Sequence, residues 1–96
     1  MNSSYHPHAE KELEQAEEYY DNISEELGDR FRDEMQVAIS RILKFPNGWQ
    51  PLSQVVRRCR LNAFPYGIVY RVKTDEIRIL AVMHLHQEPN YWVDRL

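Results

Sequence analysis

The sequence has little cysteine, little glycine and no long apolar run. Of its 96 residues, one is cysteine and three are glycine. The single thiol, Cys59, cannot support a disulfide framework and suits a reducing compartment, so we expect a cytoplasmic protein. No segment reaches the roughly 18 apolar residues of a transmembrane helix, and residues 1–10 lack the apolar core of a secretory signal. These features predict one small domain over residues 1–96, without membrane contact.

Charge is distributed unevenly behind a formal net charge of −3. Residues 1–44 carry eleven acids and five bases, whereas residues 45–96 carry four acids and seven bases. This asymmetry predicts two faces that meet different partners. A general nucleic-acid-binding protein would be basic overall, so we do not expect direct binding to nucleic acid.

The first part of the chain predicts an antiparallel helix hairpin over about residues 8–45. Apolar residues recur at spacings of three and four, as on one face of a helix. Pro7 suits a first helical position, Ser24 can cap the second helix, and Pro46 prevents its continuation. The two apolar stripes are Ala9, Leu13, Ala16, Tyr20 and Ile23, then Leu27, Phe31, Met35, Ala38, Ile42 and Phe45.

The second part predicts a sheet over about residues 54–85, followed by a tail over residues 86–96. Segments 55–61, 66–73 and 76–84 are rich in β-branched and aromatic residues, and a turn at 74–75 joins the last two. A short strand near residues 3–6 has a weaker signal. We therefore predict an α+β fold with the helix hairpin packed on a mainly antiparallel sheet of three to four strands.

Period-two alternation assigns the side chains of these strands to two faces. The face predicted to meet the helices carries Val55, Cys59, Leu61, Tyr66, Ile68, Tyr70, Val72, Ile77, Ile79, Ala81 and Met83. The other face carries Arg58, Arg60, Arg71, Lys73, Arg78, His84 and His86 around Val69, Leu80 and Val82. Exposed aliphatic groups at a sheet centre are usually covered. Either the tail, anchored by Tyr91 and Trp92, or a partner chain could cover them.

Several ordered segments together resemble a known family. They are an acidic helix hairpin ending in Phe45-Pro46, then RRCRL at 57–61, FPYGIVYR at 64–71, IRILAVMH at 77–84 and PNYW at 89–92. This order resembles the ParE branch of the ParE/RelE superfamily, the toxins of type II toxin–antitoxin modules, often called plasmid stabilisation proteins. The resemblance implies a helix hairpin over a curved sheet and neutralisation by a cognate antitoxin. ParE-like members act on DNA gyrase, whereas RelE-like members cut messenger RNA in the ribosome.

The leading functional prediction is inhibition of a protein target, with gyrase implied by the resemblance and no catalytic residue assigned. The predicted partner-binding residues are Arg58, Arg60, Arg71, Arg78, Leu80, Val82, His84, Tyr91 and Trp92. An alternative is ribosome-associated RNA cleavage, which needs proton-transfer groups beside cations. Its candidate residues are Arg58, Arg60, His84, His86 and Tyr91. A third possibility is an inactive toxin homologue that acts only as a binding partner.

Three further features have structural interpretations. Arg57 falls on the helix-facing register, where a buried charge needs a partner, and Glu34 or Asp33 is the expected one. Cys59 is expected to be an inert core thiol. The His6-Pro7-His8 and His84-Leu85-His86 pairs lack supporting carboxylate or thiolate patterns, so no metal or other cofactor is predicted.

Overall fold

The computed structural model describes all 96 residues and confirms the helix hairpin. Helix α1 spans Pro7–Ile23 and α2 spans Glu25–Lys44. Ser24 lies between them in an extended conformation, with φ −164° and ψ 149°. Its N–H donates to the Tyr20 carbonyl and its hydroxyl accepts from Leu27 N, each at 3.0 Å. One residue therefore ends the first helix and caps the second.

The sheet has five strands rather than the expected three to four. They are β1 (Asn2–Tyr5), β2 (Gln50–Pro51), β3 (Val56–Arg60), β4 (Tyr66–Val72) and β5 (Glu76–His84), in the spatial order β1-β5-β4-β3-β2. Only the β1–β5 pairing is parallel. The short strand expected near residues 3–6 is present as the edge strand β1. The strand that was not predicted is β2, whose two residues are too few to give a period-two pattern.

A bulge in β5 corrects the predicted faces of this strand. Val69 pairs with Ala81 while the next residue of β4, Tyr70, pairs with Ile79, so Leu80 is an extra residue on β5. An extra residue reverses the faces of everything beyond it. Val82 and His84 therefore lie on the helix side of the sheet. Ala81 and Met83 lie on the other side, opposite to the prediction.

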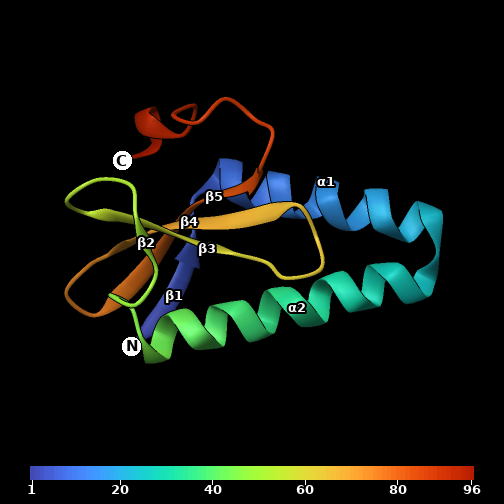
Figure 1. Ribbon diagram of the computed structural model, residues 1–96, viewed down its shortest axis with the longest axis horizontal. Coiled ribbons are helices and arrows are strands. Elements are labelled where there is room, and N and C mark those ends of the chain that lie inside the picture. Colours follow the sequence, from blue (N-terminus) through green and yellow to red (C-terminus); the bar gives the residue numbers. More distant parts are fainter.

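The helices cover one face of the sheet, and the C-terminal segment lies on the side away from α2 (Figure 1). The helix-side core is rich in aromatic rings: Tyr20 lies 5.1 Å from Phe31 and 4.8 Å from Phe64, centroid to centroid. Val56, rather than Val55, is buried in β3, and it faces away from the helices. The helix-side cluster contains Ala9, Ala16, Tyr20, Phe31, Met35, Ala38, Ile42, Cys59, Leu61, Phe64, Ile68, Tyr70, Ile77, Ile79 and Val82.

The prediction that Arg57 pairs with Glu34 or Asp33 is wrong. The Arg57 guanidinium donates to the Trp49 carbonyl at 2.8 Å and so fastens the loop after α2 to β3. Glu34 instead accepts from the backbone N–H groups of Asn62 and Ala63. A carboxylate on backbone donors satisfies a turn that lacks strand partners, so Glu34 joins α2 to the β3–β4 connection.

Replacing Ser24 by Ala tests the hairpin junction. We expect a loss of about 1 kcal/mol in the free energy of unfolding, because the cap of α2 loses its acceptor. Urea denaturation followed by circular dichroism measures it. Ser40→Ala, at an exposed position inside α2, is the matched control and should be neutral or slightly stabilising. Equal losses in both variants would contradict the capping role.

Candidate partner-binding site

The C-terminal segment covers the middle of the sheet face that the helices leave free. Trp92 is only 3% exposed, and its indole N–H donates to the Pro89 carbonyl at 2.9 Å. A 3-10 turn follows at Val93–Arg95. The sequence left open whether the tail or a partner chain covers this face, and in the structure the chain's own tail covers it. Trp92 of the tail and the sheet residues beneath it form one apolar cluster, which contains Val56, Val69, Leu80, Ala81, Met83 and Trp92.

An ion pair between α1 and the tail closes the edge of β5. Strand β1 pairs with β5 only as far as Ile79. Beyond that point the Arg95 guanidinium donates to the Leu80 carbonyl at 3.0 Å, and the Glu12 carboxylate accepts from Val82 N at 3.1 Å. The two side chains also bond each other, at 2.8 and 3.1 Å. The pair thus takes the place of a further strand at an edge that would otherwise offer free backbone groups.

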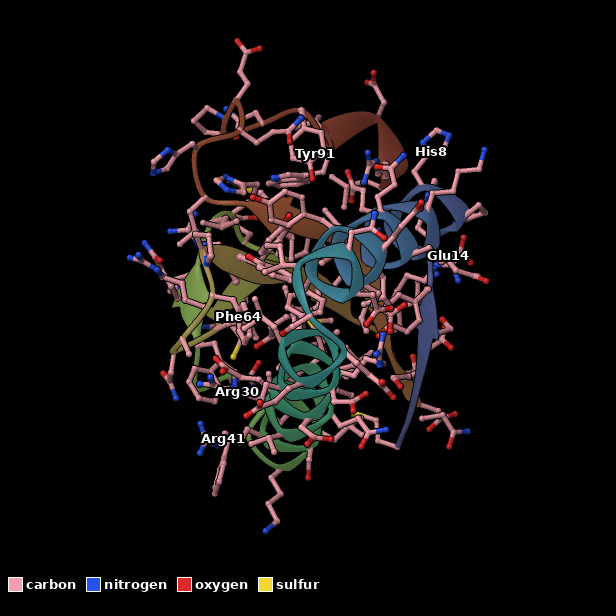
Figure 2. The ribbon with its side chains drawn as sticks, turned by 90° about the vertical axis from the view of Figure 1, so that its right-hand side faces the viewer. His8, Glu14, Arg30, Arg41, Phe64 and Tyr91 are labelled. Carbon is pink, nitrogen blue, oxygen red and sulfur yellow. The ribbon has the colours of Figure 1, made fainter.

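Tyr91 belongs to the same junction. The Arg95 guanidinium lies 4.9 Å from the centre of its ring. Burial raises the pKa of Tyr91, and the neighbouring Glu12 carboxylate raises it further. The phenol is therefore protonated at neutral pH and acts as an anchor of the tail. Figure 2 shows Tyr91 above the end of the sheet, on the tail side.

Four arginines remain accessible around the covered patch. The Arg58 side chain lies across Gly67, where an added Cβ would be 2.9 Å from its Cδ atom, and its guanidinium donates to Gln50 Oε1 at 2.9 Å. Arg71 and Arg78 lie opposite each other on β4 and β5. Arg60 is exposed, and the other three are half-buried. None of the four forms an ion pair, so their charge is available to an anionic partner.

Three other residues of the predicted site are placed differently. Val82 is 2% exposed within the helix-side core, so it is not a surface residue. Leu80 and Trp92 do lie on the predicted face, but they are buried in the same cluster. A partner could reach these two side chains only if the tail moved.

His84 lies on the helix side, away from the arginines. Its ring is 5.1 Å from that of Tyr66, and its Nδ1 accepts from His86 N at 3.1 Å. That bond assigns the proton of a neutral imidazole to Nε2. The sheet therefore separates His84 from Arg58, and the five residues of the RNA-cleavage hypothesis do not form one cluster. Of these five residues, only His86 and Arg60 line the same surface cavity.

The two His-X-His pairs repeat one local arrangement. His6 Nδ1 accepts from His8 N at 3.0 Å, as His84 does from His86. In the first pair this bond caps α1. No group of three or more histidine, cysteine, aspartate or glutamate side chains is arranged to hold a metal ion. No helix has the length and apolar character needed to cross a membrane.

A groove between α2 and β3 is the feature that the sequence analysis missed. Arg30 and Arg41 line it from the helix, and Arg60 lines it from the strand. The spacing of eleven residues places Arg30 and Arg41 on one helix face three turns apart, which is a readable signal. The sequence analysis did not predict this basic stripe because acidic residues outnumber basic ones in this half of the chain.

Comparisons with known proteins agree with this architecture. Residues 4–89 match the family model of the ParE toxin of the type II toxin–antitoxin system parDE. The chain belongs to the ParE toxin family. Toxin ParE2 of Mycobacterium tuberculosis, from strains CDC 1551 and H37Rv alike, is 34% identical over 86 residues, covering 88% of this chain and 82% of the relative.

A solved structure supports the fold of this ParE toxin. A chain of the chromosomal ParDE toxin–antitoxin system from P. aeruginosa matches with a TM-score of 0.76 and 21% identity, covering 90% of this chain and 97% of the other. The resemblance drawn from the ordered sequence segments is therefore confirmed, both as a family and as a helix hairpin on a sheet.

Glu12→Ala tests the closure of the β5 edge. The variant leaves Val82 N without its acceptor and Arg95 without its partner, so we expect faster amide hydrogen exchange at Val82. The free energy of unfolding should fall by about 1–3 kcal/mol. Glu14→Ala, at an exposed position on the same helix, is the matched control and should leave both quantities nearly unchanged. Unaltered exchange at Val82 in Glu12→Ala would contradict the closure.

His6 predicts a pH dependence of stability. Partial burial and the nearby charges of His8 and Arg95 lower the pKa of His6 below its usual 6.5. The folded state therefore favours the neutral ring, and this stabilisation is complete above about pH 6.5 and is lost as pH falls through the folded pKa. His6→Asn keeps a capping acceptor without titrating, so its thermal unfolding should depend less on pH between about 8 and 5. Equal slopes for wild type and His6→Asn would overturn the assignment.

Proposed function

We propose that this ParE toxin is neutralised by a cognate antitoxin and inhibits growth in the cytoplasm by binding a protein target, DNA gyrase. Membership of the ParE family and the 34% identity to Toxin ParE2 support the toxin role. The name of the P. aeruginosa ParDE system supports an antitoxin as partner. Gyrase is proposed as the target because ParE-like toxins, which the sequence resembles, act on gyrase.

The observation that carries the choice of mechanism is the separation of His84 from the arginines. Cleavage of RNA needs a base and an acid within hydrogen-bond reach of one phosphate, with cations beside it. Here β5 turns His84 toward α1, and Tyr91 is a buried, protonated anchor. Arg58, Arg71 and Arg78 face the other side without a proton-transfer group among them. Such a surface suits binding better than catalysis.

The principal alternative is a RelE-type endonuclease, and one observation favours it. His86 and Arg60 line one cavity of about 550 Å³ at the ends of β3 and β5. A single imidazole beside a single guanidinium is an incomplete set for this chemistry, because no second proton-transfer group lines the cavity. An inactive homologue that only binds partners would instead leave growth unaffected when expressed without antitoxin.

Two assays on the purified chain discriminate these functions. We expect inhibition of gyrase supercoiling at stoichiometric toxin, relieved by the cognate antitoxin. We expect no site-specific messenger cleavage in a translation extract. The variants His86→Ala and Arg60→Ala should therefore behave like wild type in this assay. Messenger cleavage abolished by His86→Ala, with gyrase unaffected, would replace the proposal by the endonuclease.

A further inference from the structure

A groove of about 360 Å³ runs between α2 and the outer edge of β3. Its helix wall is one stripe, Arg30, Glu34, Val37 and Arg41, at spacings of four, three and four residues. At 1.5 Å per residue this stripe is about 16 Å long. Three turns of a helix or about five residues of an extended chain match that length. The opposite wall is Trp49, Cys59, Arg60 and Leu61.

Three cations of the groove have no partner within the chain. Arg30, Arg41 and Arg60 are exposed and form no ion pair. Arg32, on a neighbouring face of α2, does bond Asp21 at 2.7 Å and Asp29 at 3.1 Å. Figure 2 shows Arg30 and Arg41 on the same side of the helix. In a chain of net charge −3, this is a local excess of positive charge that attracts anionic groups.

The acids of the groove do not cancel this excess. The carboxylate of Glu34 already accepts from the N–H groups of Asn62 and Ala63. Only Asp33 lines the groove with a free carboxylate. The three guanidinium groups therefore outnumber the anions that can reach them.

The groove also offers apolar and hydrogen-bonding contacts. Val37 is 48% exposed, although it lies beside the buried Ala38. The indole Nε1 of Trp49 is buried and has no hydrogen-bond acceptor. Strand β2 pairs only with Arg57 and Arg58, so the edge of β3 is uncovered from Cys59 onward. An unsatisfied donor and an open strand edge are features that a bound peptide can complete.

We infer that this groove receives an acidic segment of the antitoxin that carries one apolar side chain. Its carboxylates face Arg30, Arg41 and Arg60. The apolar side chain packs between Val37 and Trp49, and a carbonyl or carboxylate oxygen accepts from Trp49 Nε1. Charge complementarity selects an acidic segment, and the acidic remainder of the helix hairpin repels it from other sites. The inference rests on the proposed antitoxin partner.

The test is the affinity of the cognate antitoxin for groove variants, measured by calorimetry at low and high salt. We expect Arg30→Glu/Arg41→Glu to bind at least about tenfold more weakly and to lose most of the salt dependence. Trp49→Phe keeps an aromatic ring but lacks the N–H, and should bind about threefold to tenfold more weakly. The control with equal charge change, Lys11→Glu/Lys73→Glu, should stay within about twofold of wild type. Circular dichroism checks that each variant is folded.

Three outcomes would overturn the inference. Wild-type affinity in the folded double arginine variant excludes the groove, although antitoxin binding itself stands. Failure of the wild-type chain to bind the antitoxin removes the partner proposal as well. If the double variant instead loses binding to a single-stranded RNA oligonucleotide while keeping the antitoxin, the groove is a phosphate-binding surface.

Discussion

One extra residue in β5 determines which side chains meet on this protein. At the bulge, Leu80 and Ala81 both face the tail, and the strand continues with its faces reversed. Val82 is consequently drawn into the core under α1, and His84 follows it to the helix side. Without the bulge, His84 would lie among the arginines as the alternation predicts. The division between a core-side histidine and a tail-side basic surface therefore depends on this local irregularity.

The tail depends on the same irregularity. Because two consecutive residues, Leu80 and Ala81, present apolar groups to one face, the sheet offers a broad patch on which Trp92 packs. Arg95 can then reach the Leu80 carbonyl and the Glu12 carboxylate at the unpaired edge. In a small domain, burial of this second face and protection of a strand edge both limit self-association. The arginines that stay accessible around this patch, Arg58, Arg60, Arg71 and Arg78, form no ion pair within the chain.

Long periodic elements could be predicted from the sequence, and local departures from periodicity could not. The helix stripes, Ser24 as a cap and the turn after β4 depend on spacing and on local chemistry, so the helix hairpin and the three main strands were predicted correctly. The bulge leaves no compositional mark, because Leu80, Ala81, Val82 and Met83 suit either face. The partner of Arg57 also depends on how the loop carrying Trp49 folds back on β3. The arginine positions were predicted, but their relation to His84 required the register.

The bulge in β5 turns Val82 and His84 to the helix side and Met83 to the tail, so that the chain acts through binding surfaces and not through a histidine–arginine centre. Nuclear Overhauser contacts of the Val82 and Met83 methyl groups measure this register directly. We predict contacts between the Met83 methyl group and the Trp92 indole, and between the Val82 methyl groups and Ala16. Contacts between Val82 and Trp92, with Met83 facing the helices, would contradict it.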